Sequence, residues 1–293
     1  MADARFTGTG VAIVTPFNND FSVDFPSLEN VTNNCIQNGV NYIVVLGTTG
    51  ESATLTKDEK KQVVKTVIKA ANGRVPIVIG IGGNFTQEVV ETIQHTDFTG
   101  IDAILSVSPY YNKPNQAGLY EHYKAIASVS PLPIILYNVP GRTAMNMTSE
   151  TIVKLAHDFK NIIAVKEASG NFVQIMEILR DKPAEFAVIS GDDALTLPMI
   201  SVGAVGVISV IANSHPKEFS VMVDEALGNN YVLARKMHLS LIETINQLFA
   251  DGSPAGVKAI LEMKSLCKNF VRLPLVPVGE KTYNKLKALY SAK

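Results

Sequence analysis

The segment Asn161–Asn171, "NIIAVKEASGN", decides the fold class. Its apolar run, residues 162–165, leads directly into Lys166 and Glu167, and a Ser-Gly pair follows. An unbroken apolar run of this length is typical of a strand covered on both faces, as the strands of parallel sheets are. Lysine is seldom buried without a partner or a chemical role. The segment therefore predicts a parallel sheet and raises the question of what Lys166 does.

Seven further runs of this kind occur along the first two-thirds of the chain. They are "GVAIVTPF" (10–17), "NYIVVLGTT" (41–49), "VPIVIGIGG" (75–83), "DAILSVSPYY" (102–111), "LPIILYNVP" (132–140), "FAVISGDDA" (186–194) and "VGVISVIAN" (205–213). Amphipathic segments such as 25–39 and 57–73 separate them, at a spacing typical of one βα unit. Eight such repeats predict an α/β fold that closes into a (β/α)8 TIM barrel, not an open doubly wound sheet.

Helix punctuation agrees with this alternation. Thr56 and Glu59 have the spacing of a capping box, and Gly39 and Gly73 stand where glycines commonly end helices. After the eighth run, three consecutive helices are expected, at 216–230, 231–250 and 253–269, then a Pro-rich segment and a short final helix. A barrel needs only one of these helices. We therefore expect a barrel in residues 1–224 that carries the active site, and a C-terminal helical layer in 225–293 packed on it.

Composition excludes several classes of protein. The 293 residues are 46% hydrophobic and 18% charged with a formal net charge of -1, so no nucleic-acid partner is indicated. No apolar run approaches the roughly 20 residues of a membrane span, and the N-terminal segment lacks a signal-peptide pattern. We expect a cytoplasmic protein without a membrane partner. Cys35 and Cys267 are then expected to be buried, unpaired and helical.

Metal chemistry finds no support in the sequence. The five histidines are scattered over helical segments and form no ligand pair on one face. Asp192 and Asp193 would suit magnesium, but adjacent acids commonly cap the helix that follows. We expect helix capping for this pair and no metal or other cofactor in the reaction.

In a TIM barrel the active site lies at the carboxyl ends of the strands. The polar residues that the expected strands bring to this end are Thr48, Thr49, Glu51, Tyr110, Tyr111, Tyr137, Arg142, Lys166, Glu167, Gly191, Asp192 and Asp193. Burial favours the neutral form of a lysine amine, which can attack a carbonyl to form a Schiff base. The alternative is a structural salt bridge, for which Glu167 is a poor partner of Lys166 because adjacent strand residues point to opposite faces.

Two neighbouring segments could serve such a lysine. Tyr137 ends the preceding strand, where its phenol could transfer protons or simply fill the barrel mouth. The turn "GTTGES" (47–52) offers two hydroxyls and exposed amides that suit a carboxylate. It lacks the Gly-Lys-Ser/Thr of a phosphate-binding loop. From the residues alone, both the catalytic and the structural interpretations stay open.

Three motifs together resemble those of the dihydrodipicolinate synthase family, which lies in the N-acetylneuraminate lyase group of pyruvate-dependent class I aldolases. They are "GTTGES" (47–52), "YNVPGRT" (137–143) and "VKEASGN" (165–171), and the resemblance extends over essentially the whole chain. It implies a lyase that condenses pyruvate with L-aspartate-4-semialdehyde to 4-hydroxy-tetrahydrodipicolinate, in diaminopimelate and lysine biosynthesis. It also implies that Lys166 forms a Schiff base with pyruvate, that the resulting enamine attacks the aldehyde, and that no cofactor is needed.

The resemblance also implies roles for the other site residues. Tyr137 matches the proton-transfer tyrosine, Thr48 the threonine that links it to a second tyrosine, Tyr111 that second tyrosine, which reaches into the adjacent subunit's site, Thr49 the pyruvate carboxylate site, Gly191 and Ile208 the pocket lining, and Arg142 the residue that binds the semialdehyde carboxylate. A guanidinium suits such bidentate recognition.

Assembly and regulation are implied in the same way. The family usually forms a homotetramer, a dimer of dimers, and some members are inhibited by lysine at the tight-dimer interface. The residues that match this regulatory pocket are Ser52, Ala53, Asn84, Glu88 and Tyr110. Lys57 and Lys60 stand where regulated relatives often carry histidine or an acid. Cationic side chains would repel the ammonium groups of lysine, so strong feedback inhibition is not expected.

Two alternatives to this function are open. One is a lyase or aldolase for N-acetylneuraminate or a 2-keto-3-deoxy sugar acid that uses the same Schiff base. Members of that kind typically lack an arginine at the position of Arg142, so "VPGRT" favours the semialdehyde. The other is a barrel that binds a keto acid without turning it over, and such a binder has no need of the amine.

Overall fold

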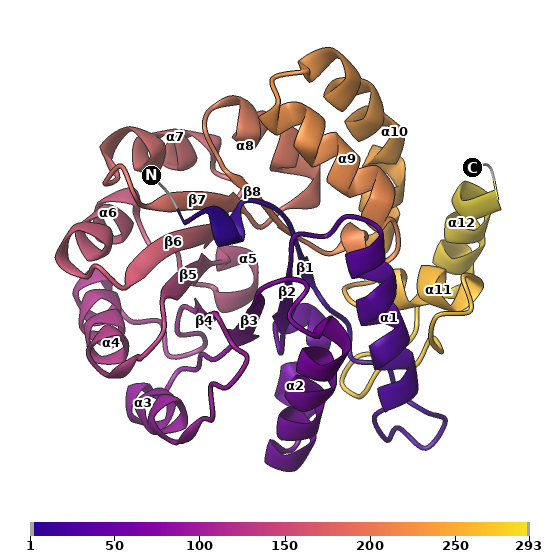
Figure 1. Ribbon diagram of the computed structural model, residues 1–293, viewed down its shortest axis with the longest axis horizontal. Coiled ribbons are helices and arrows are strands. Elements are labelled where there is room, and N and C mark those ends of the chain that lie inside the picture. The colour runs from indigo at the N-terminus through magenta and orange to yellow at the C-terminus, as the bar shows by residue number, and fades with distance from the viewer. Residues whose placement is uncertain (1–2, 292–293) are drawn as a thin grey trace.

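The computed structural model describes residues 3–291 and contains a closed barrel of eight parallel strands. The strands follow one another in chain order, and β8 pairs with β1 to close the barrel (Figure 1). Their bounds are β1 (Gly8–Ala12), β2 (Tyr42–Val45), β3 (Ile77–Gly80), β4 (Ala103–Val107), β5 (Ile134–Asn138), β6 (Ile162–Glu167), β7 (Ala187–Ser190) and β8 (Gly206–Ser209). The predicted (β/α)8 TIM barrel is confirmed, and each strand lies within or overlaps its expected run.

Helices surround the barrel, and their bounds follow chain order. They are α1 (Phe25–Gln37), α2 (Lys57–Ala71), α3 (Thr86–His95), α4 (Gln116–Val129), α5 (Pro140–Thr143), α6 (Ser149–Asp158), α7 (Phe172–Asp181), α8 (Thr196–Ser201), α9 (Pro216–Leu227), α10 (Tyr231–Phe249), α11 (Ala255–Met263) and α12 (Glu280–Ser291). At the start of α2, Thr56 and Glu59 form the predicted capping box. Gly39 takes a φ of 92° after α1, as a terminating glycine should. After α2, Asn72 is the first residue with a positive φ, at 48°, one position before Gly73.

Large side chains fill the amino-terminal end of the barrel. Tyr42, the first residue of β2, is fully buried, and its hydroxyl donates to the Val207 carbonyl at 3.3 Å. Phe6 packs edge-on against its ring, with the centroids 5.7 Å apart. A Cβ at Gly10 would lie 2.2 Å from this ring, so β1 needs a glycine there. With this end packed, the interior can receive a small molecule only near the carboxyl ends of the strands.

The C-terminal helices lie on one side of the barrel, drawn from orange to yellow in Figure 1. Helix α9 contacts β1 and β8, as the last outer helix of a barrel does, and α10 packs on α9. Helices α11 and α12 pack on each other and on α10, which agrees with the expected helical layer. The predicted domain boundary after residue 224 falls inside α9 and stays a prediction.

Helix α11 ends earlier than predicted. Ser265 takes a φ of 57°, and the Leu266 N–H donates to the Leu261 carbonyl at 2.9 Å, which is the bond of a Schellman ending. Cys267 therefore lies in the irregular segment that follows and not in a helix, which corrects the prediction. Both Cys267 and Cys35 are buried free thiols, as expected. Burial raises the pKa of each thiol to about 12.

A buried ion pair fastens this layer to the turn after β2. Lys258 of α11 is fully buried, and its Nζ donates to Glu51 Oε1 at 2.5 Å and to the Phe270 carbonyl at 2.8 Å. The same Nζ lies 4.2 Å from the centroid of the Phe17 ring. Burial lowers the pKa of Lys258, and the charge of Glu51 opposes that shift. Glu51, expected at the active-site end, thus directs its carboxylate toward α11.

Arg272 adds a second connection between the same parts of the chain. Its N–H donates to Glu51 Oε2 at 3.0 Å, and its guanidinium donates to the Thr54 carbonyl at 2.8 Å. The guanidinium also bonds both carboxylate oxygens of Glu59. These hydrogen bonds lower the pKa of Glu59 to about 2. The turn that carries Thr48 and Thr49 is therefore held by residues far away in the sequence.

Candidate active site

The carboxyl ends of β5 and β6 bring Tyr137 and Lys166 together. The two residues are partners in the register of these strands, and both lie almost wholly in the interior, 7% and 5% exposed. Lys166 Nζ lies 4.4 Å from the centroid of the Tyr137 ring. Within residues 3–291, no carboxylate forms an ion pair with Lys166. The structure thus lacks the salt bridge that would explain this lysine as purely structural.

Gly191 leaves the space that the lysine side chain occupies. It follows β7 directly, and its N–H donates to the Glu167 carbonyl at 2.8 Å. A Cβ at this position would lie 3.1 Å from both Cγ and Cε of Lys166 and 2.7 Å from Cβ of Ala168. Only glycine therefore leaves room for the lysine stem in its present position. Ile208 of β8 belongs to the same interior cluster as Tyr137, so four predicted site residues converge here.

The turn after β2 places Thr48 and Thr49 differently. They begin the short 3₁₀ helix η2 (Thr48–Gly50), in which Thr49 is buried and Thr48 is exposed. Thr15 Oγ1 fixes this turn by donating to the Gly50 carbonyl at 2.7 Å. In the part of the chain that the structure describes, no hydrogen bond joins Thr48 to Tyr137 or to Tyr111. The proton relay that the resemblance implies stays a prediction.

Tyr111 and Arg142 lie outside this interior group. Tyr111 is 88% exposed and has a φ of 71°, in the loop after β4. Arg142 is exposed on the one-turn helix α5. Among residues 3–291 its guanidinium has no hydrogen bond or ion pair, so all its donors are available to a ligand. The structure therefore keeps both residues at the active-site end without bringing either into contact with Lys166.

Comparison with known proteins identifies the family. The model of the dihydrodipicolinate synthetase family matches residues 5–293. The chain belongs to this family. A 4-hydroxy-tetrahydrodipicolinate synthase from Parabacteroides distasonis is 54% identical, over 98% of this chain and 97% of the relative. The family and the function that the three sequence motifs predicted are confirmed at this level.

Two solved structures of family members carry small molecules. The dihydrodipicolinate synthase of Acinetobacter baumannii, solved with pyruvate, is 41% identical, with a TM-score of 0.94 over 97% of this chain and 98% of that one. The enzyme of Cyanidioschyzon merolae, solved with lysine bound, is 38% identical, with a TM-score of 0.95 over 99% of each chain. The fold of this chain is therefore that of synthases known to bind these two molecules.

A polar residue that sequence reasoning left without a role lies behind the family's lysine. Glu167 is fully buried, and its carboxylate accepts from the Ser169 N–H at 2.7 Å and from Asn138 Nδ2 at 3.0 Å. Burial raises the pKa of Glu167. The sequence held a signal for this contact, because Tyr137-Asn138 and Lys166-Glu167 are equivalent pairs at the ends of neighbouring strands.

The acidic pair after β7 divides its tasks. Asp192 accepts from the Ala194 and Leu195 N–H groups, at 2.8 and 3.3 Å, and so caps the 3₁₀ helix η4 (Asp193–Leu195) as predicted. Asp193 instead accepts from the Val210 and Ile211 N–H groups, which ties the loop after β7 to the loop after β8. Burial raises the pKa of Asp193 to about 6. Both acids therefore have structural partners.

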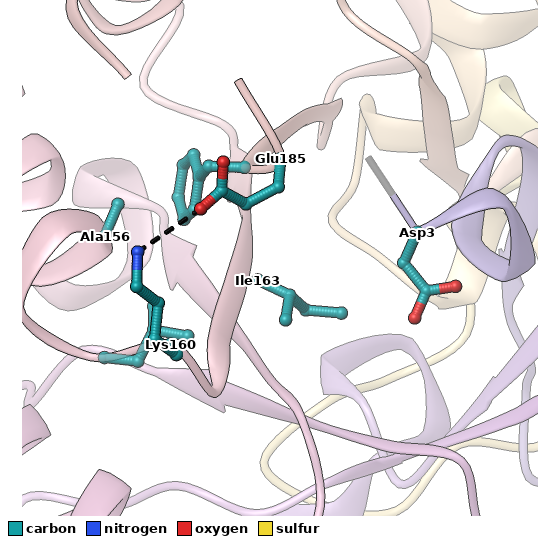
Figure 2. A pocket seen from close by; sticks show the side chains of 7 residues that line it. Asp3, Ala156, Lys160, Ile163 and Glu185 are labelled. Atoms are coloured by element: carbon teal, nitrogen blue, oxygen red, sulfur yellow. Dashed lines mark hydrogen bonds and ion pairs between the residues drawn. The ribbon is translucent and has the colours of Figure 1, made fainter. Parts of the chain in front are cut away.

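A cavity of about 160 Å³ lies at the opposite end of the barrel, where β6 and β7 begin. Figure 2 shows Lys160 and Glu185 pointing toward each other beside it, with Asp3 on another side. The Lys160 Nζ and a Glu185 carboxylate oxygen are 3.4 Å apart, and both side chains are largely exposed. The cavity is separated from Lys166 by the length of β6 and takes no part in the candidate site.

Two general searches of the described residues gave no site. Within residues 3–291, no three side chains of His, Cys, Asp or Glu are grouped as metal ligands would be. No helix in the same range combines the length and the apolar character needed to cross a membrane.

Proposed function

We propose that this chain condenses pyruvate with L-aspartate-4-semialdehyde through a Schiff base on Lys166. The observation that supports this role is the buried Lys166 amine, which has no carboxylate partner and lies against Tyr137 where parallel strands end. An amine in such a place is free to act as a nucleophile. Family membership supplies the reaction, and the geometry supplies the candidate residue for it.

Each step of the reaction needs a group that the site offers. The Lys166 amine adds to the pyruvate ketone, water leaves, and the protonated Schiff base withdraws electrons from the methyl carbon. Loss of a methyl proton gives an enamine, whose carbon attacks the aldehyde. The amine of the added semialdehyde then displaces Lys166 as the ring closes. Tyr137 is positioned to carry protons in these steps, and the turn at Thr49 to hold the pyruvate carboxylate.

Arg142 is proposed to select the acceptor aldehyde through its carboxylate. Replacing Arg142 with alanine is expected to lower kcat/KM for the semialdehyde by about 10- to 100-fold, because a charged hydrogen-bonded pair contributes ~1.5–3 kcal/mol. Initial rates with the semialdehyde, N-acetylmannosamine and glyceraldehyde, for both enzymes, measure this. Arg180, an exposed arginine of α7 paired with Asp181, is the matched control for an Arg→Ala change. Faster turnover of either sugar aldehyde by the unchanged enzyme would overturn the proposal.

The homotetramer, a dimer of dimers, and the cytoplasmic location also belong to this proposal. Supporting the association, exposed aromatic side chains gather on the loops after β3 and β4, at Phe85, Tyr110 and Tyr111. Asn84 Nδ2 donates to the Tyr110 carbonyl at 3.1 Å, and Asn112 Nδ2 donates to the Asn84 carbonyl at 2.8 Å. Such a fixed, exposed aromatic surface suits contact with a second copy of the chain.

The regulatory pocket is proposed at Ser52, Ala53, Asn84, Glu88 and Tyr110. We expect lysine to inhibit only weakly, because Lys57 and Lys60 place two positive charges in the first turn of α2. Replacing both with alanine is expected to lower the inhibitory lysine concentration by about two- to fivefold, the effect of removing weak exposed repulsions. A lysine titration of activity measures it, with Lys65→Ala on the same helix as control. Inhibition of the unchanged enzyme at low micromolar lysine would contradict this prediction.

A further inference from the structure

A buried polar cluster connects the ends of β5 and β6 to the loop that carries Arg142. Its members are Glu167, Asn138, Asn146 and Gln174. Asn138 and Glu167 are register partners one position beyond Tyr137 and Lys166, so they point away from the interior on the outer face of the same two strands. Asn138 and Glu167 are fully buried, and Gln174 is nearly so. The cluster therefore lies directly behind the candidate catalytic pair.

The hydrogen bonds of the cluster run in one direction, from amides to Glu167. Asn138 Nδ2 donates to Glu167 Oε2 at 3.0 Å, Gln174 Nε2 donates to the same oxygen at 3.3 Å, and the Ser169 N–H donates to Oε1 at 2.7 Å. Within residues 3–291 this carboxylate has no cationic partner. A buried carboxylate is costly unless donors compensate it. Its partners here are neutral amides that belong to three different segments.

The same amides hold the far end of the Arg142 loop. Asn138 Nδ2 donates to Asn146 Oδ1 at 2.9 Å, and the Met147 N–H donates to Asn138 Oδ1 at 3.0 Å. Asn146 Nδ2 in turn donates to Gln174 Oε1 at 2.8 Å. The loop leaves β5 after Asn138, carries Arg142 on α5, and returns to the strand ends at Asn146. Both of its ends are thus bonded to the strands that present Tyr137 and Lys166.

We propose that this cluster is a positioning device for Arg142 and so determines the preference for an acceptor aldehyde with a carboxylate. Arg142 itself has no side-chain partner within the described residues, so its place relative to Lys166 depends on the loop. The cluster fixes that loop to the outer face of β5 and β6. This inference rests on the proposed recognition of the semialdehyde by Arg142.

Asn146→Ala removes the loop's side-chain bonds and leaves Glu167, Asn138 and Gln174 in place. We expect kcat/KM for the semialdehyde to fall about 10- to 100-fold, mainly through a higher KM for this substrate, because displacing a binding group by about 1 Å has effects of that size. Formation of the pyruvate adduct, trapped with borohydride, is expected to change less than about twofold. Asn161→Ala is the matched control, since Asn161 also makes an amide hydrogen bond, to the Ala127 carbonyl, at the other end of β6.

A double variant separates positioning from general damage. In an Arg142→Ala background, Asn146→Ala is expected to have less than about a twofold further effect, because the group that it positions is gone. An equal loss in both backgrounds, or an equal loss of pyruvate adduct formation, would overturn the inference. If Asn146→Ala does not fold, Gln174→Met removes the neighbouring bonds with little change in shape and is tested in the same way.

The two proposals fail in distinguishable ways. An Arg142→Ala enzyme with unchanged acceptor preference would remove the basis of both. An Arg142→Ala enzyme that loses the preference, together with an Asn146→Ala enzyme that keeps it, would overturn only the positioning role of the cluster.

Discussion

Replacing Lys166 with methionine is expected to abolish the condensation, with kcat reduced by about 10⁴-fold or more, because no covalent intermediate can form. Methionine matches most of the lysine stem, so the space between Gly191 and Tyr137 stays filled and the fold should be retained. Turnover of pyruvate and the semialdehyde measures the loss. Incubation with pyruvate and borohydride, followed by peptide mass spectrometry, should place the reduced adduct on Lys166 of the unchanged enzyme and nowhere in the variant.

Lys160→Met is the matched control for this experiment. Lys160 lies just before the amino end of β6, pairs with Glu185 and is largely exposed, so its loss should leave turnover and adduct formation unchanged (Figure 2). Near-normal turnover by the Lys166 variant, or an adduct on another lysine, would refute the assignment of the nucleophile. The test is independent of the acceptor aldehyde, because the Schiff base forms with pyruvate alone.

Features with a short sequence period were predictable. The eight apolar runs gave the barrel, because each run is one strand and alternation with helices requires parallel pairing. The position of Lys166 and Tyr137 at the ends of their runs gave their convergence. The period of two along a strand correctly placed Glu167 on the face opposite to Lys166. Each inference used only neighbours within a few residues.

Features that depend on distant or atypical contacts were not predictable. Glu51 and Lys258 are 207 positions apart, and nothing near Glu51 in the sequence shows that its carboxylate faces α11. The end of α11 depends on a left-handed Ser265, a conformation that this residue type does not announce. The need for glycine at position 191 follows from contact with the lysine stem, which only the folded chain reveals.

Replacing Lys258 with methionine is expected to lower the free energy of unfolding by about 3–5 kcal/mol. Removal of one partner of a buried ion pair leaves the other charge buried and uncompensated, here the carboxylate of Glu51. Chemical denaturation at a fixed protein concentration measures the change. Lys69→Met is the matched control, because Lys69 forms an exposed ion pair with Glu29 and should leave the denaturation midpoint unchanged. A Lys258 variant as stable as the unchanged protein would contradict this prediction.

The double variant Glu51→Gln/Lys258→Met distinguishes the two consequences of this ion pair. Without a buried charge, most of the lost stability should return, because replacing both partners of a buried pair is often nearly neutral. Glu51 also accepts the Arg272 N–H and directly follows η2, which carries Thr48 and Thr49. If the pair serves stability alone, turnover will recover together with stability. If it also fixes the turn, the double variant will regain stability but keep a raised KM for pyruvate, and that second result is the one that the position of Glu51 predicts.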